Sequence, residues 1–140
     1  MNQSYANILK KNMKPKKENN VQTVEIVLNN AVATRFNLSD ECKRKISIKK
    51  GFVVNDSYIN QNRTDSDIIQ VIKELGEKKC SCMYRNFKND IKIVSFQYDQ
   101  KTEIYRLHNF DGYEFIIIYG QNGKKYDIDS DTGNRISYKK

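Results

Sequence analysis

The sequence predicts an α+β fold in which about two helices pack on one face of an antiparallel β-meander. In the first half of the chain, two segments repeat apolar residues three and four positions apart, which is the spacing of a half-buried helix. From Asp90 onwards apolar and polar residues alternate instead, and an Asp-Gly and an Asn-Gly pair separate the alternating runs. A length of 140 residues suits a single domain with one modest core, which we place at residues 21–140.

A lysine-rich segment, residues 1–20, precedes this domain, and we expect it to be a disordered arm. Its basic side chains are Lys10, Lys11, Lys14, Lys16 and Lys17. The arm holds one Glu and carries about half of the net charge of +8, which suits a nucleic-acid backbone or another polyanion. A solvated, solubilising tail is the alternative. Tyr5, Ile8 and Leu9 would also suit a short helix that folds on a protein partner.

The first strand and the first helix follow the arm. Alternating residues predict a strand at residues 21–28, and a loop at residues 29–37 leads from it to the helix. Ser39 is a typical N-cap, and the helix should run to about Lys49 and stop at Gly51. Its outer positions form a candidate anion-binding face, with a solvated helix face as the alternative. The cations of this face are Lys43, Arg44, Lys45, Lys49 and Lys50.

The clearest helix runs from Arg63 to Gly76, after a polar loop at residues 52–62. Thr64 and Asp67 have the spacing of a capping box, so Thr64 should cap the helix, and Gly76 should end it in a left-handed conformation. The apolar face of this helix consists of Ile68, Val71, Ile72 and Leu75. Capping explains Asp65, but no local feature explains Arg63. We expect Arg63 to pair with an acid and to join the helix to the sheet; the candidate acids are Asp65, Asp111 and Glu114.

The second half of the chain predicts the meander. Strands are expected from Asp90, at residues 103–109 and 114–119, and at residues 125–128 and 135–138, with Asp111-Gly112 as a tight turn. Several aromatic residues lie on or beside these strands: Tyr98, Tyr105, Phe110, Tyr113, Phe115 and Tyr119. Basic residues are mixed with them: Lys92, Lys101 and Arg106. Such a sheet can stack the bases of a single strand, and cross-strand aromatic packing is the alternative.

Residue patterns typical of catalysis or of metal binding do not appear. His108 is the only histidine and has no nucleophile beside it in the sequence. The aspartates at residues 127–131 do not fit the spacing of a calcium loop, and the Cys-Ser-Cys segment at residues 80–82 has no second pair of ligands. The six glycines form no phosphate loop. We therefore expect no enzyme, no catalytic residue, no metal and no cofactor.

Targeting signals are equally scarce. The longest apolar run, residues 115–119, is far shorter than the roughly 18 residues that a membrane span needs, and the N-terminus lacks the apolar core of a signal peptide. Three cysteines, an odd number, suggest a reducing compartment. We expect an intracellular protein that is not secreted and has no membrane partner.

Five segments occur in an order that is similar to a known pattern. The first two are Val24–Asn29, a strand that ends in Asn, and Thr34–Ser39, at the place of a Gly-Gly-Phe-Ser-Leu-Ser turn. The third is Arg63–Gly76, at the place of an Arg-Thr-Asp-Pro helix that ends in Glu-Leu-Gly. The last two are Ile91–Val94, a Leu-Lys-Ile-Val type of strand, and Tyr105–Glu114, at the place of a hairpin with Tyr-Asp-Gly-x-Glu. In these segments the chain resembles a small uncharacterised domain of large DNA viruses, including giant viruses, and of phages.

The resemblance implies an α+β fold, a viral source and a place in the host cytoplasm or the virion, and it transfers no catalytic residue. The chain departs from the pattern at three places: Thr34 and Arg35 replace paired glycines, Ser66 replaces proline, and His108-Asn109 replaces an acidic pair. We expect a non-enzymatic accessory protein that binds nucleic acid or another polyanion through the arm and the first helix. The alternative is a protein-interaction module that docks through the arm or through the aromatic sheet.

Overall fold

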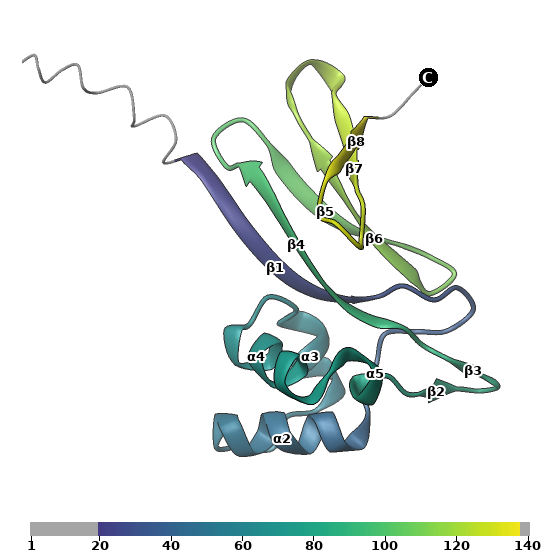
Figure 1. Ribbon diagram of the computed structural model, residues 1–140. Helices are drawn as coiled ribbons and strands as arrows, with labels where there is room; N and C mark the ends of the chain where they lie inside the picture. The colour runs from purple at the N-terminus through teal and green to yellow at the C-terminus, as the bar shows by residue number, and fades with distance from the viewer. Residues whose placement is uncertain (1–19, 138–140) are drawn as a thin grey trace, which may run out of the picture.

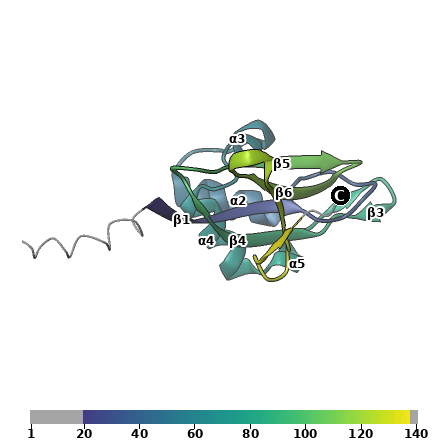
Figure 2. The ribbon, with the colours of Figure 1, turned by 90° about the horizontal axis from the view of Figure 1, so that it is seen from above.

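A computed structural model describes residues 20–137. The predicted arm, with Lys10, Lys11, Lys14, Lys16, Lys17 and the Tyr5–Leu9 segment, lies outside the described residues. The described chain has the predicted α+β fold and forms three layers (Figure 1). Helices make up one outer layer, two long strands form a ribbon in the middle, and a four-stranded sheet makes up the other outer layer. Figure 2, seen from above, shows the four-stranded sheet over the ribbon, with the helices behind it.

The elements are, in chain order, β1 (Val21–Asn29), α2 (Asp40–Lys50), α3 (Asp56–Gln61), α4 (Ser66–Leu75), α5 (Glu77–Cys80), β2 (Met83–Tyr84), β3 (Phe87–Lys88), β4 (Ile91–Asp99), β5 (Ile104–Phe110), β6 (Tyr113–Tyr119), the 3-10 turn η2 (Gln121–Gly123), β7 (Lys125–Ile128) and β8 (Arg135–Ser137).

The strand β4 does not belong to the meander, which corrects the predicted sheet. It pairs antiparallel with β1 along nine residues of each strand, and the meander consists of β5, β6, β7 and β8 alone. The reason is that both faces of β4 are apolar: Ile91 and Ile93 face the helices, whereas Val94 and Phe96 face the sheet. Such a strand has to be covered on both sides, so the helices pack on the ribbon and not on the meander.

Two buried clusters hold the three layers together. The cluster between the helices and the ribbon includes Val27 of β1, Ile46 of α2 and Ile72 of α4, each 0% exposed. The cluster between the ribbon and the sheet includes Leu28 of β1 and Ile118 of β6. Consecutive residues of β1 thus enter different clusters, as the alternation along a strand requires.

The boundaries of α2 are as predicted. The Ser39 hydroxyl accepts a hydrogen bond from the Cys42 N–H at 3.2 Å, and Gly51 ends the helix in the left-handed region with φ of 84°. Both Cys42 and Ile46 are buried on its inner face. Capping residues and a C-terminal glycine therefore sufficed to locate this helix.

The start of α4 differs from the prediction, because Asp65 and not Thr64 is the cap. The Asp65 carboxylate accepts hydrogen bonds from the N–H groups of Asp67, at 2.8 Å, and of Ile68, at 3.1 Å. A carboxylate is a stronger acceptor than a hydroxyl at the positive end of a helix. Gly76 ends the helix with a positive φ of 102°, but its ψ of 139° lies outside the left-handed helical region.

Two segments for which the sequence predicted no helix or strand contain short elements. The loop at residues 52–62 holds α3, which the Asn55 side chain caps by accepting the Tyr58 N–H at 2.8 Å. Residues 77–89 form α5 and a short hairpin of β2 and β3. Each of these elements has at most six residues, too few to show a periodic pattern.

A buried ion pair joins all three layers. The Arg63 guanidinium contacts the Glu114 carboxylate with both terminal nitrogens, each at 2.9 Å, and the two side chains are only 9% and 6% exposed. Glu114 lies on β6 and also accepts the Asn29 N–H of the ribbon at 2.9 Å. Arg63 in addition donates to the Val27 carbonyl at 3.2 Å and lies over the Phe36 ring, 3.5 Å from its centre. Of the three candidate acids, Glu114 is thus the partner of Arg63.

The tight turn between β5 and β6 fits closely against the loop that follows β1. Asp111 and Gly112 have the positive φ angles, 51° and 88°, that the Asp-Gly pair predicted. A Cβ atom on Gly112 would lie 1.8 Å from the Thr34 carbonyl oxygen. The Gly112 carbonyl accepts a hydrogen bond from the buried Asn29 side chain at 2.8 Å. Glycine is therefore required here both for its conformation and for its size.

We predict that Glu114→Gln lowers the free energy of unfolding by about 3–5 kcal/mol, because it leaves the buried Arg63 charge without its partner. Urea denaturation measures this loss. The matched control is Glu25→Gln, which removes a partly exposed ion pair with Lys73 and should cost less than about 1 kcal/mol. Equal losses in the two variants would contradict a special role of the buried pair.

We predict that Gly112→Ala costs about 3 kcal/mol or more, since it adds a steric clash with Thr34 to the strain of a positive φ. Gly123→Ala is the control, because Gly123 has a similar φ of 76° but no atom within 4 Å of the added carbon. That variant should lose only about 1–2 kcal/mol in the same denaturation experiment. A Gly112 variant no less stable than the Gly123 variant would show that the turn can move away from the loop.

Candidate nucleic-acid interface

In the described part of the chain, no helix or strand covers the outer face of the β5–β8 sheet (Figure 1). Tyr105, Leu107, Ile116 and Ile118 point inward to the ribbon, so the alternate residues of the same strands point outward. We call these outward residues the outer face. They are Ile104, Arg106, His108, Phe110, Tyr113, Phe115, Ile117, Tyr119, Lys125, Asp127 and Ile136.

Aromatic rings occupy the centre of the outer face. His108 of β5 lies directly opposite Phe115 of β6, and their rings stack with centres 5.5 Å apart and planes inclined by 19°. The Tyr119 hydroxyl forms a 2.8 Å hydrogen bond with Nε2 of His108. The Tyr113 ring lies 5.9 Å from the Phe115 ring. The result is a row of rings along β6 that the His108 ring of β5 joins.

Charged and exposed apolar side chains surround this row. Arg106 is exposed opposite Ile117, and the Lys125 ammonium lies 5.7 Å from the centre of the Tyr119 ring. Asp127 is the single acid of the outer face; burial raises its pKa, while nearby His108 acts in the opposite direction. Phe110, at the end of β5, is 71% exposed. The outer face thus combines two cations with rings that solvent can reach.

The structure separates the predicted aromatic residues into two groups. Phe110, Tyr113, Phe115 and Tyr119 lie on the outer face. Tyr98 and Tyr105 instead pack edge to face between the ribbon and the sheet, with ring centres 5.1 Å apart and planes inclined by 77°. For this pair aromatic packing is observed, as in the alternative interpretation, although it joins two layers and not two paired strands.

The predicted cations divide in the same way. Arg106 lies on the outer face, whereas Lys92 pairs with Asp131 at 2.9 Å and Lys101 lies in the β4–β5 turn. Sequence reasoning did not assign His108, Lys125 or the exposed apolar residues to this surface. The Asp-Gly pair could have predicted the position of His108. A two-residue turn at Asp111-Gly112 fixes the register of the hairpin, and this register places His108 opposite Phe115.

The cations of α2 do not form one unpaired basic face. Lys43 lies 3.0 Å from Asp56, and Lys50 lies 2.6 Å from Asp65. Arg44, Lys45 and Lys49 remain exposed on the helix. Two of the five predicted binding residues therefore stabilise the contacts of α2 with α3 and α4, and Lys50 neutralises the cap of α4.

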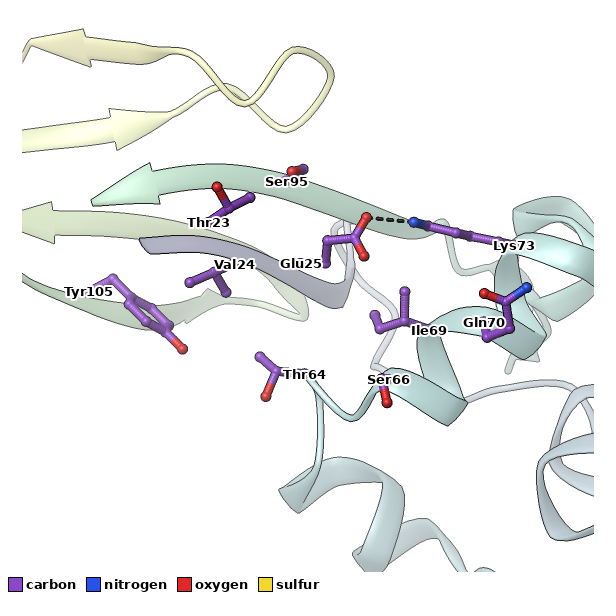
Figure 3. Close-up of a pocket in the computed structure, with 10 residues that line it drawn as sticks. All are labelled: Thr23, Val24, Glu25, Thr64, Ser66, Ile69, Gln70, Lys73, Ser95 and Tyr105. Atoms are coloured by element: carbon purple, nitrogen blue, oxygen red, sulfur yellow. Dashed lines mark hydrogen bonds and ion pairs between the residues drawn. The ribbon is translucent and has the colours of Figure 1, made fainter. Parts of the chain in front are cut away.

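A groove of about 520 Å³ lies between the first half of β1 and the start of α4 (Figure 3). Hydroxyl groups from Thr23, Thr64, Ser66, Ser95 and Tyr105 line it. Its two charged lining residues, Glu25 and Lys73, pair with each other at 2.6 Å. Because these charges cancel, the groove offers neutral hydrogen-bonding groups and does not attract a polyanion.

Net charge within residues 20–137 is small. The terminal segments contain seven of the 25 basic residues and one of the 17 acidic residues, so the described residues hold 18 basic and 16 acidic side chains. Most of the net charge of +8 therefore belongs to residues 1–19 and 138–140. Any attraction of the folded part for a polyanion must come from local groups of cations.

The described residues provide neither a metal site nor a membrane-spanning helix. No group of three or more His, Cys, Asp or Glu side chains within residues 20–137 is arranged to hold a metal ion. No helix in this range is long and apolar enough to cross a membrane. Cys42, Cys80 and Cys82 are free thiols, and the first two are buried.

Comparison of the chain with protein-family models, with curated proteins and with solved structures found no match. The function therefore has to be inferred from the surfaces described above.

The contact between Lys50 and Asp65 makes a prediction about pH. Burial opposes ionisation of the Asp65 carboxyl, but the Lys50 ammonium and the N–H groups of Ile68 and Asp67 outweigh it and lower its pKa. A lowered pKa in the folded state adds stability that is complete above the unfolded pKa of about 4 and is lost as the pH falls below it.

We predict that Asp65→Asn lowers the free energy of unfolding by about 1 kcal/mol at pH 7, because Asn still caps the helix but cannot pair with Lys50. The difference between the two proteins should shrink as the pH falls from about 4 towards 2. Thermal unfolding at a series of pH values measures it. A difference that stays constant over this range would contradict the proposed charge effect.

Proposed function

We propose that this protein binds single-stranded nucleic acid across the outer face of the β5–β8 sheet. The observation that carries the proposal is the row of rings formed by His108, Phe115 and Tyr119, uncovered and adjacent to Arg106 and Lys125. Aromatic rings stack with the bases of an unpaired strand, and neighbouring cations contact its phosphates. Such a site needs neither a metal nor a catalytic group.

The geometry of the face favours a single strand over a duplex. The rings lie on an open sheet and not in a narrow cleft, so the bases of an unpaired strand can reach them. In a duplex the bases stack on one another, and only the phosphates would remain available to Arg106 and Lys125. We therefore expect a short single strand to bind more tightly than the same sequence in a duplex.

The charge of the terminal lysines also supports the proposal. Residues 1–19 and 138–140 carry most of the net charge and would attract a polyanion to the protein. Affinity should then fall steeply as the salt concentration rises, since bound phosphates release counterions. Stacking contributes little to this dependence, so salt separates the two parts of the interaction.

A protein partner on the same face is the second candidate. Ile104, Phe110 and Ile136 of the outer face are 51%, 71% and 52% exposed, and exposed apolar residues of this kind are typical of docking surfaces. A protein partner would bury these side chains and would depend less on salt. The alternative is thus a protein-interaction module that uses the aromatic sheet.

We predict that Phe110→Ala weakens the binding of a fluorescent oligouridine about 5- to 100-fold without a change in stability, because it removes an exposed stacking ring. Fluorescence anisotropy measures the affinity of the full chain. The control is Phe52→Ala, because Phe52 is also exposed, at 52%, but lies in the α2–α3 loop.

The proposal predicts wild-type affinity for the Phe52 variant. Equal affinities of the wild type and the Phe110 variant would remove the outer face from the site. If the wild type bound neither oligouridine nor oligothymidine at low salt, nucleic-acid binding would be wrong and the protein partner would be the better hypothesis.

A further inference from the structure

The short hairpin of β2 and β3 extends from one end of the ribbon (Figure 1). Tyr84 pairs with Phe87 across it, and Arg85 in its turn has a positive φ of 58°. Met83 is 61% exposed and Phe87 is 58% exposed. The hairpin lies outside the outer face, the α2 cations and the groove. It nevertheless carries two exposed apolar residues, and the cations Arg35 and Arg85 lie beside its Tyr84 ring.

Two guanidinium groups surround the Tyr84 ring. The Arg35 guanidinium lies 4.5 Å from the ring centre and donates a 3.0 Å hydrogen bond to the Tyr84 hydroxyl. The Arg85 guanidinium lies 5.3 Å from the same centre. Lys88 lies on β3, opposite Met83, so its side chain points to the face of the hairpin opposite to the Tyr84 ring. Among residues 20–137, no carboxylate lies within ion-pair distance of these three cations, in contrast to Lys43, Lys50 and Lys92.

Two guanidinium groups beside one ring repel each other. The hydrogen bond from Arg35 and the charges of Arg35 and Arg85 lower the pKa of the Tyr84 phenol. An anion bound between the guanidinium groups would relieve the repulsion. Guanidinium groups also hold phosphate with two parallel N–H donors, and stacking on Tyr84 limits the entropy that Arg35 loses on binding.

The hairpin shares one end of the fold with the outer face. Arg35 and Ala33 belong to the same loop after β1; Arg35 contacts the hairpin, and the Ala33 N–H donates to the Asp111 carbonyl in the β5–β6 turn at 2.7 Å. Phe110, the most exposed ring of the outer face, directly precedes that turn. A strand that leaves the outer face beyond Phe110 therefore reaches the side of the molecule where the hairpin lies.

We propose that Arg35 and Arg85 form a phosphate-binding site for the sugar-phosphate backbone of the same single strand that lies on the outer face. This inference rests on the proposed function. The outer face stacks the bases, and the hairpin contacts the phosphates of the nucleotides that continue past Phe110. The exposed Phe87 ring offers one further base a stacking surface.

The test uses the full chain with the double substitution Arg35→Gln/Arg85→Gln, and measures oligouridine affinity over a series of salt concentrations. Each lost phosphate contact on a single strand reduces the slope of log affinity against log salt by about 0.7, so the slope should become shallower by about 1.4. Arg35→Lys/Arg85→Lys keeps both charges and should restore most of the slope. Lys78→Gln/Lys101→Gln removes two exposed charges elsewhere and should leave the slope nearly unchanged.

The outcomes separate this inference from the proposed function. If the wild type binds but the Gln variant keeps its slope and its thermal stability, the hairpin site is wrong and the outer face remains. If the wild type binds no oligonucleotide, both proposals fail.

Cations beside Met83 and Phe87 would also suit an anionic membrane. Loss of binding to phosphatidylserine vesicles with an unchanged oligonucleotide slope would therefore assign the hairpin to lipid and overturn the proposal.

Discussion

The three layers of this fold depend on the buried ion pair of Arg63 and Glu114. A ribbon of two strands is not stable in water by itself and needs cover on both faces. Arg63 precedes α4, in the helical layer, and Glu114 lies on β6, in the sheet. Their contact therefore links the two layers that cover the ribbon. Burying two charges is costly, but the Asn29 N–H and the Val27 carbonyl satisfy atoms that water would otherwise bind. The pair thus specifies how the layers are arranged more than it adds net stability.

The same contact determines which residues reach the outer face. Side chains alternate along β6, so an inward Glu114 requires an inward Ile116 and Ile118 and an outward Phe115. A shift of one residue would place the row of rings inside and the isoleucines outside. The close fit of Gly112 against Thr34 sets the same register from the turn. A buried structural contact and an exposed candidate site are therefore two consequences of one strand register.

Local features could be predicted from the sequence, and distant pairings could not. The limits of α2 and the two faces of β4 follow from capping residues and alternation over a few positions. The pairing of β1 with β4 joins segments more than 60 residues apart. The apolar pattern of a strand does not indicate which other strand it pairs with. The Arg35 contact with Tyr84 depends on the path of an irregular loop, which no periodicity describes. Thus the sequence revealed the rings of the candidate site, whereas the proposed phosphate-binding residues are brought together only by the folded chain.

The buried polar contacts of this fold are separate from the candidate site. Five residues form the hydrogen-bond network beneath the β5–β6 turn: Asn29, Thr34, Arg63, Gly112 and Glu114. This network determines how the layers are joined, and none of its five residues belongs to the outer face. His108 does belong to the outer face, where its ring stacks on Phe115. An acid at this position would repel phosphates, whereas the imidazole ring is compatible with the proposed binding of a polyanion.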